Sequence, residues 1–107
     1  MPIIDVSGLF PSEGSVKIQI RKEIRRYFAG RLGILEDSTT VTFITDEIMD
    51  GQEHVMARLY SKSFMKMDPR ELEEICDEIL AILEKAGHPY NEVFPIPVLA
   101  MRGRSLK

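Results

Sequence analysis

Two amphipathic helix patterns of opposite charge constrain the fold of this 107-residue chain more than any other feature. In the first pattern, between Glu13 and Leu32, apolar residues recur at every fourth position and therefore share one helix face. Ser12 predicts the N-cap of this helix, and Gly33 predicts its end. The apolar stripe consists of Val16, Ile20, Ile24, Phe28 and Leu32, with Tyr27 beside it.

The second helix pattern carries the clearest start signal in the sequence. Asp68 predicts the N-cap, Pro69 stands at the first helical position and Glu71 stands at the third. Gly87 predicts the end of the helix. The stripe that we expect to be buried consists of Leu72, Ile75, Cys76, Ile79, Leu83 and Ala86.

The two helices differ strongly in charge. Residues 13–32 contain six cations and two anions, a net charge of +4, and residues 68–86 contain two cations and seven anions, a net charge of −5. If the helices lie side by side, ion pairs are expected along their flanks. The acidic second helix and the overall formal charge of −3 argue against nucleic acid as a partner of the basic helix.

Four segments have the composition of β-strands: residues 1–6, 39–45, 54–64 and 93–98. In the second segment Val41 and Phe43 fall on one face, and Asp50-Gly51 then predicts a turn. The third segment alternates, which gives it two distinct faces. One face consists of Val55, Ala57, Leu59 and Ser61, and the other consists of Met56, Arg58, Tyr60 and Lys62.

The order of these segments is strand, helix, strand, strand, helix, strand. It predicts an α+β fold of tandem βαβ halves, in which a four-stranded mixed sheet carries both helices on one face. A chain of 107 residues has room for one domain, which we place at 1–107. In the last strand, Pro95 and Pro97 put both missing N–H groups on the same edge. Because the helices cover one face only, a partner subunit is expected on the other.

Several classes of function are disfavoured. No apolar run approaches the roughly 20 residues of a membrane helix, and the N-terminus lacks a secretory signal, so we expect a cytoplasmic protein with no membrane partner. The single cysteine, Cys76, forms no internal disulfide and makes no metal set with His54 and His88, which we interpret as surface residues. Buried, negative surroundings raise a thiol pKa, so Cys76 is expected to be a poor nucleophile.

Pro2 is the strongest candidate for a catalytic residue in this sequence. An internal proline has no N–H and no basic nitrogen, but removal of Met1 turns Pro2 into a secondary amine. Free α-amines titrate at roughly pH 8, and burial lowers that pKa because desolvation disfavours the charged form. Such an amine is a general base at neutral pH. The alternative is that Pro2 is an ordinary structural residue.

The start Met1-Pro2-Ile3-Ile4, the chain length, the order of elements and the run from Val41 to Met49 together resemble the tautomerase superfamily, which includes oxalocrotonate tautomerase and macrophage migration inhibitory factor. The resemblance is to the longer members with two βαβ halves in one chain. It implies a tautomerase/MIF-like fold, a homotrimer and no cofactor. It also implies that Pro2, freed of Met1, moves a proton between the carbon and oxygen ends of a small keto–enol substrate such as an α-keto acid.

The resemblance implies further site residues. Lys62 and Phe94 fall near positions that contact substrate in related proteins, and Arg58, on the same strand face as Lys62, adds a second cation. Their alternatives are a solvated residue for Lys62, a core residue for Phe94 and a structural ion pair for Arg58. Two cations of the family are missing here, near Ser12 and at Gly33-Ile34-Leu35. Two hypotheses follow: a cofactor-independent tautomerase, or a catalytically silent oligomeric binding protein with the same fold.

Overall fold

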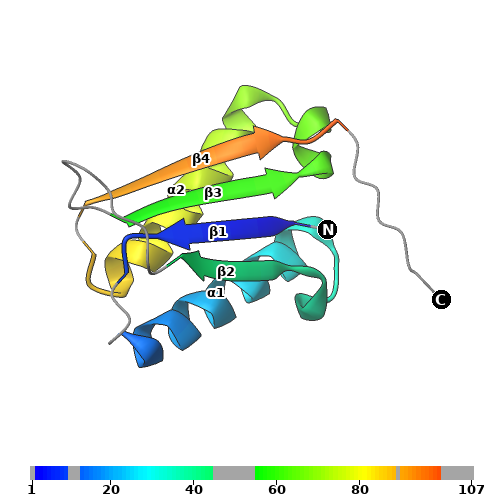
Figure 1. Cartoon of the computed structure of the whole chain (residues 1–107). Coiled ribbons are helices and arrows are strands. Elements are labelled where there is room, and N and C mark those ends of the chain that lie inside the picture. Colours follow the sequence, from blue (N-terminus) through cyan, green and yellow to red (C-terminus); the bar gives the residue numbers. More distant parts are fainter. Residues whose placement is uncertain (1, 10–12, 45–54, 89, 100–107) are drawn as a thin grey trace.

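A four-stranded mixed sheet carries both long helices on one of its faces (Figure 1). The computed structural model describes residues 2–9, 13–44, 55–88 and 90–99. In chain order the elements are β1 (Ile3–Ser7), α1 (Gly14–Leu32), the short 3-10 helix η1 (Glu36–Ser38), β2 (Thr40–Ile44), β3 (Val55–Ser61), the 3-10 helix η2 (Lys62–Lys66), α2 (Pro69–Lys85) and β4 (Asn91–Pro97). The predicted α+β fold with both helices on one face is confirmed.

Strand β1 lies inside the sheet, whose order is β2-β1-β3-β4. It pairs with β2 in parallel, with Ile3 beside Thr40, and with β3 antiparallel, with Ile3 beside Tyr60. Strands β3 and β4 are parallel. Each half of the chain therefore contributes one parallel strand pair, and the antiparallel contact between β1 and β3 joins the two halves.

The core lies between the sheet and the two helices. On the helix side of the sheet, Ile4 and Val6 of β1 are fully buried, as are Ala57 and Leu59 of β3, which confirms the alternation predicted for β3. Each helix contributes the middle of its predicted stripe. The fully buried helix residues are Ile20, Ile24 and Phe28 of α1 and Ile75, Ile79 and Leu83 of α2.

The helix ends follow the local signals. The backbone of Gly33 is left-handed, with φ of +66°, and it ends α1 as predicted. Glu13 occupies the N-cap position of α1 without a side-chain cap, while the predicted cap Ser12 lies outside the described residues. In α2 the predicted cap is confirmed, because Asp68 Oδ1 accepts a hydrogen bond of 2.9 Å from the backbone N–H of Glu71.

Strand β3 is shorter than predicted. It ends at Ser61 and does not continue to Phe64, because Ser61 Oγ accepts a hydrogen bond from the backbone N–H of Ser63 and so starts the 3-10 helix η2. The predicted start at His54 and the turn at Asp50-Gly51 lie outside the described residues. The last strand begins at Asn91, two residues before the predicted position.

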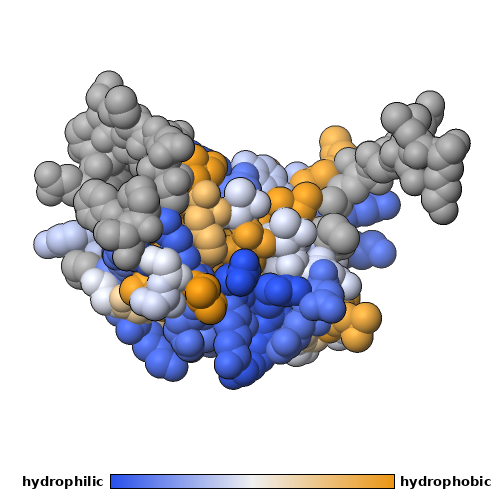
Figure 2. Space-filling model, turned by 60° about the horizontal axis from the view of Figure 1, so that its bottom comes forward, coloured by the Kyte–Doolittle hydropathy of each residue, from blue (hydrophilic) through white to orange (hydrophobic). Residues whose placement is uncertain are grey.

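Ion pairs join the flanks of the two helices, as their opposite charges predicted. Lys85 Nζ lies 3.0 Å from Glu23 Oε1, and Arg31 Nη2 lies 3.5 Å from Glu71 Oε2. Tyr27 lies in the same seam, and its pKa is raised mainly by burial, with Arg31 opposing the change. Seen from the side of α1, hydrophilic side chains gather over this helix and apolar ones gather above it (Figure 2).

The two prolines of β4 share one edge of the strand, as predicted, and that edge is the free edge of the sheet. The N–H of Val98 donates to the carbonyl of Ser61, which shows that even-numbered residues of β4 turn toward β3. Pro95 and Pro97 are odd-numbered and therefore turn outward. At these two positions the edge offers carbonyl acceptors and no N–H donor, which weakens it as a template for another strand.

We expect Asp68→Ala to lower the free energy of unfolding by about 1 kcal/mol, because the N–H of Glu71 loses its cap. Chemical denaturation at neutral pH measures this difference. Asp77→Ala is the control, since Asp77 is exposed within the same helix and should change stability by less than about 0.5 kcal/mol. Equal effects of the two substitutions would contradict a specific role of the cap.

Candidate functional site

Pro2 lies at the end of the sheet where β1 and β2 begin and where β3 and β4 end. Its side chain is fully buried in the chain. Its carbonyl accepts a hydrogen bond of 3.1 Å from the backbone N–H of Thr40, which continues the β1–β2 ladder by one residue. By alternation from Ile4 and Val6, the pyrrolidine ring faces the helix side of the sheet.

Two buried hydroxyl groups flank Pro2. Extended by one residue, the strand registers place Thr39 beside Pro2 on the β2 side and Ser61 beside it on the β3 side. Ser61 is fully buried, and its oxygen accepts the N–H of Ser63. Thr39 is 3% exposed, and its Oγ1 has no hydrogen-bond partner among the described residues. Neither hydroxyl group was predicted as a site residue from the sequence, because only the strand pairing brings them to Pro2.

Lys62 is the predicted site residue that the fold brings to the same end of the sheet as Pro2. It is exposed and immediately follows Ser61, the residue beside Pro2. A lysine side chain is long and flexible, so its ammonium group serves as a mobile point charge. Lys62 therefore stays a predicted partner for an anionic group near Pro2.

Arg58 and Phe94 lie on the opposite face of the sheet from Pro2. They are neighbours in the β3–β4 register, and Asp5 lies directly across from Arg58 on β1. Phe94 is 43% exposed, so its interpretation as a core residue of this chain is wrong. Within one chain these two residues do not join Pro2 in a single site.

No described helix or strand covers the face that carries Arg58 (Figure 1). Its centre is the row formed by Asp5, Arg58 and Phe94, and apolar side chains surround that row. By strand parity the apolar members of this open sheet face are Ile3, Ile44, Met56, Tyr60 and Ile96. By the same parity Glu92 lies on this face beside Met56, so the face combines apolar area with the charged residues Asp5, Arg58 and Glu92.

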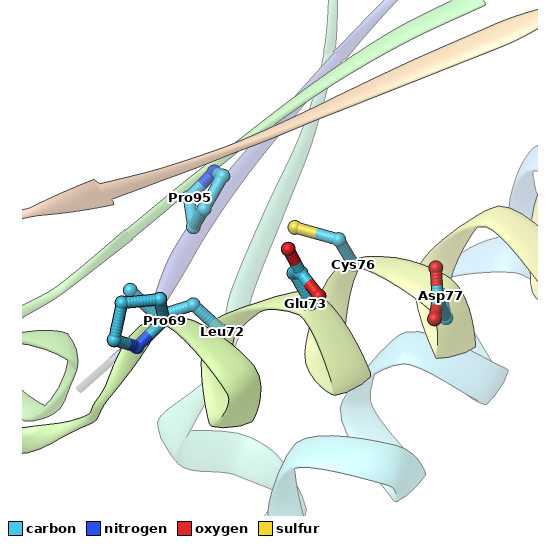
Figure 3. A pocket seen from close by; sticks show the side chains of 6 residues that line it. All are labelled: Pro69, Leu72, Glu73, Cys76, Asp77 and Pro95. Carbon is cyan, nitrogen blue, oxygen red and sulfur yellow. The ribbon is translucent and has the colours of Figure 1, made fainter.

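A separate pocket of about 380 Å³ lies between α2 and the edge strand β4. Figure 3 shows Pro95 on the strand above the side chains of α2. Cys76 lines this pocket and is half-buried; burial, then the nearby Asp77 and Glu73, raise the pKa of its thiol. The predicted rise of the thiol pKa is thus confirmed, and because a raised pKa leaves less thiolate, we still expect Cys76 to be a poor nucleophile. The lining residues are Pro69, Leu72, Glu73, Cys76, Asp77 and Pro95.

His88 is less exposed than predicted. Its Nε2 lies 3.2 Å from Glu13 Oε1 at the start of α1, and its side chain is 20% exposed. In the described parts of the chain, no three histidine, cysteine or acidic side chains gather where a metal ion could bind. None of the helices in those parts has the length and apolar character needed to cross a membrane.

The resemblance to the tautomerase superfamily implies cations at two positions where this sequence has none, and the structure describes one of these positions. The segment after α1, Gly33-Ile34-Leu35, supplies no positive charge, and Leu35 points into solvent. The other position, near Ser12, lies outside the described residues. Lys62 is therefore the cation that the predicted set offers at the Pro2 end of the sheet.

No protein-family model and no curated protein sequence matches this chain. Solved structures do match it. Leishmania major MIF2 superposes with a TM-score of 0.72 over 96% of this chain and 93% of that one, at 15% sequence identity. The macrophage migration inhibitory factor of Trichinella spiralis gives a TM-score of 0.71 over 90% and 88% of the two chains, at 13% identity.

A fused 4-OT asymmetric trimer also matches, with a TM-score of 0.63 over 90% of this chain and 85% of that one, at 8% identity. A protein of unknown function from Vibrio cholerae superposes with a TM-score of 0.71 over 91% of this chain and 77% of that one, at 13% sequence identity. Identities this low leave the fold as the shared property. The strand order, the two helices on one face and these superpositions agree: the chain has the tautomerase/MIF-like fold.

Proposed function

We propose that this protein is a cofactor-independent tautomerase or isomerase in which Pro2, after removal of Met1, acts as the general base on a small keto–enol or α-keto acid substrate. The observation that carries the proposal is the full burial of Pro2 at the start of an inner strand. A charged amine at that position would be poorly solvated. Burial therefore favours the neutral form and lowers the amine pKa toward neutrality.

The proposed reaction needs only a proton transfer. In ketonisation, the neutral amine of Pro2 accepts the proton of the enol hydroxyl while the C=C electrons move toward the substrate carbon. The protonated amine then delivers a proton to that carbon, which completes the keto product and regenerates the base. The substrate is neither oxidised nor reduced.

Lys62 is proposed to bind the carboxylate of the substrate. A carboxylate at Pro2 needs a cation within hydrogen-bond reach, and Lys62 follows the residue beside Pro2. Arg58 and Phe94 face the other side of their own sheet, so we propose that a neighbouring copy supplies them if they contact the substrate. Their role therefore depends on the assembly.

The assembly that we propose is a homotrimer whose open sheet faces pack together. Asp5 and Arg58 lie side by side at the centre of that face, so each copy presents both charges to its neighbours. The surrounding apolar side chains supply area to bury. Support also comes from the fold, since one structural neighbour is itself a trimer.

The alternative is a catalytically silent oligomeric binding protein that retains this fold. Two observations favour it: the segment after α1 carries no cation, and an unrelated pocket lies between α2 and β4. Catalysis of an enol reaction separates the two candidates, because binding alone produces no rate acceleration.

We expect protein from which Met1 has been removed to accelerate ketonisation of an enol such as phenylenolpyruvate. General-base assistance is worth about 10²–10⁴-fold, so the effect should exceed the spontaneous rate clearly. The rate should rise with pH as the Pro2 amine loses its proton and should level off once the amine is neutral. Pro2→Ala should be slower, because a primary amine lacks the fixed ring geometry.

The decisive control is the same chain with Met1 retained, because Pro2 is then an amide nitrogen with no lone pair available as a base. Intact mass establishes which form is present. Equal rates from the two forms would remove Pro2 as the base and would favour the binding-protein alternative.

If Lys62 binds the substrate carboxylate, Lys62→Ala should raise KM about tenfold with a smaller change in kcat, since the contact exists before the proton moves. Steady-state kinetics at the pH of maximal rate measure both constants. The matched control is Lys66→Ala, an exposed cation of the same 3-10 helix, which should leave KM unchanged. An unchanged KM for Lys62→Ala would exclude Lys62 from the site.

We expect sedimentation to give the mass of three chains at micromolar concentration. Arg58→Glu should shift the protein toward smaller species, because it places like charges at the centre of the open sheet face. The double substitution Asp5→Arg with Arg58→Asp should restore the trimer, since it exchanges the two charges. The mass of a single chain for the unmodified protein would rule out the proposed assembly.

A further inference from the structure

The pocket between α2 and β4 has an acidic side and no cation among its lining residues. Its volume of about 380 Å³ lies within the range of ligand pockets. Pro69, Leu72 and Pro95 give it an apolar wall. Glu73 and Asp77, both exposed, add two carboxylates to the lining from α2 (Figure 3). Such a pocket fits an occupant that combines positive charge with an apolar body.

The two carboxylates of the pocket have no cationic partner in the described parts of the chain. On the side of α2 that faces α1, Glu71 pairs with Arg31. The ion pairs among the described residues include neither Glu73 nor Asp77. The side of α2 that faces β4 therefore carries negative charge that the described residues do not pair.

The free edge of β4 adds further hydrogen-bond acceptors. Odd-numbered residues of β4 turn their backbone groups away from β3, so the carbonyls of Val93 and Pro95 face outward. Pro95 has no N–H to offer. Carboxylates and carbonyls only accept hydrogen bonds, and a guanidinium group has five N–H donors and no acceptor. Arginine side chains are thus the chemical complement of this surface.

The chain that follows β4 carries such donors. Residues 100–107, which lie outside the described residues, are called the basic tail below. They contain Arg102, Arg104 and Lys107 and no acidic residue, a net charge of +3. The basic tail is therefore opposite in charge to the side of α2 that lines the pocket, and opposite charges select and orient partners.

The described chain ends close to the pocket. Pro97, the last residue of β4, pairs with Ser61, and η2 leads from Ser61 to the start of α2 (Figure 1). Arg104 follows Pro97 by seven residues, which span up to about 25 Å when extended. The helix from Pro69 to Asp77 rises by about 12 Å. The basic tail is therefore long enough to turn back and run along the pocket.

The spacing of the two arginines matches that of the two carboxylates. In an extended segment, residues two apart point to the same side, which would put Arg102 and Arg104 about 7 Å apart. Glu73 and Asp77 are four apart on a helix, so they share a face with a rise of about 6 Å. Two arginine–carboxylate pairs can then form together. One exposed pair stabilises little, so the arrangement depends on both pairs and on the apolar wall.

We propose that the basic tail docks in the pocket between α2 and β4 of its own chain, with Arg102 at Glu73 and Arg104 at Asp77. This inference is independent of the proposed function of Pro2. Because the tail is tethered to β4, its effective concentration at the pocket is on the order of millimolar. The docked tail covers the thiol of Cys76 and the outward carbonyls of β4, and so closes this side of the molecule to other ligands.

NMR relaxation of ¹⁵N-labelled protein at low ionic strength measures the docking. The backbone order parameters at Arg102 and Arg104 should lie above about 0.6, the value below which a segment is flexible. Glu73→Gln combined with Asp77→Asn should bring both values below about 0.6, because the guanidinium groups lose their charged acceptors. High salt should act in the same direction on the unmodified protein, since it screens exposed pairs.

The matched control is Glu74→Gln combined with Glu78→Gln. It removes two exposed charges with the same spacing from the same helix, but on the side near Tyr27, and should leave the order of the basic tail unchanged. Order parameters below about 0.6 in the unmodified protein would overturn the proposal. An equal loss of order in the two double variants would overturn it as well, because the tail would then respond to the charge of α2 as a whole.

The single cysteine of the chain tests which chain supplies the tail. Ser105→Cys places a second thiol next to Arg104, and oxidised glutathione should join it to Cys76 within one chain. Intact mass should then show one chain that has lost two hydrogens, and Glu73→Gln with Asp77→Asn should slow this cross-link several-fold. Disulfide-linked pairs of chains as the main product would overturn the assignment to the chain's own tail. Thiols that stay free or bound to glutathione would overturn docking itself.

Discussion

The placement of β1 between two partners is the constraint on which the rest of the structure depends. Its five residues pair in parallel with β2 and antiparallel with β3, which joins the two βαβ halves into one sheet. An inner strand buries its first residues as well as its middle, so Pro2 becomes a core residue although it stands next to the chain start. A terminal amine on an edge strand would remain solvated, and its pKa would stay near that of a free amine.

The helices explain both what the chain buries and what it leaves open. Because both lie on one face, their apolar stripes complete a single core, and their opposite charges meet in the ion pairs Lys85–Glu23 and Arg31–Glu71. Surface pairs of this kind add little stability each. The larger consequence is the open sheet face, where Arg58 and Phe94 lie on the side away from Pro2. A site that uses all the predicted residues is thus a property of an assembly and not of one chain.

The Pro2 end of the sheet is more apolar than an anion site usually is. Pro2, Thr39 and Ser61 are buried there, and Lys62 supplies a charge from the surface. Low polarity would suit the base proposed for Pro2, which must remain neutral, but it would make binding of the proposed α-keto acid depend on few contacts.

The sequence by itself determined the elements and their approximate ends. Periodicity gave the helix stripes, Gly33 and Asp68 marked the helix boundaries, and the pattern of β3 identified its buried face, because these signals act over a few residues. Tertiary structure decided the rest. The end of β3 at Ser61, the exposure of Phe94 and the separation of Arg58 from Pro2 depend on strand pairing between segments far apart in the chain. For the same reason, only the folded sheet placed the Thr39 hydroxyl beside Pro2, since 37 positions in sequence separate two residues that the β1–β2 register makes neighbours.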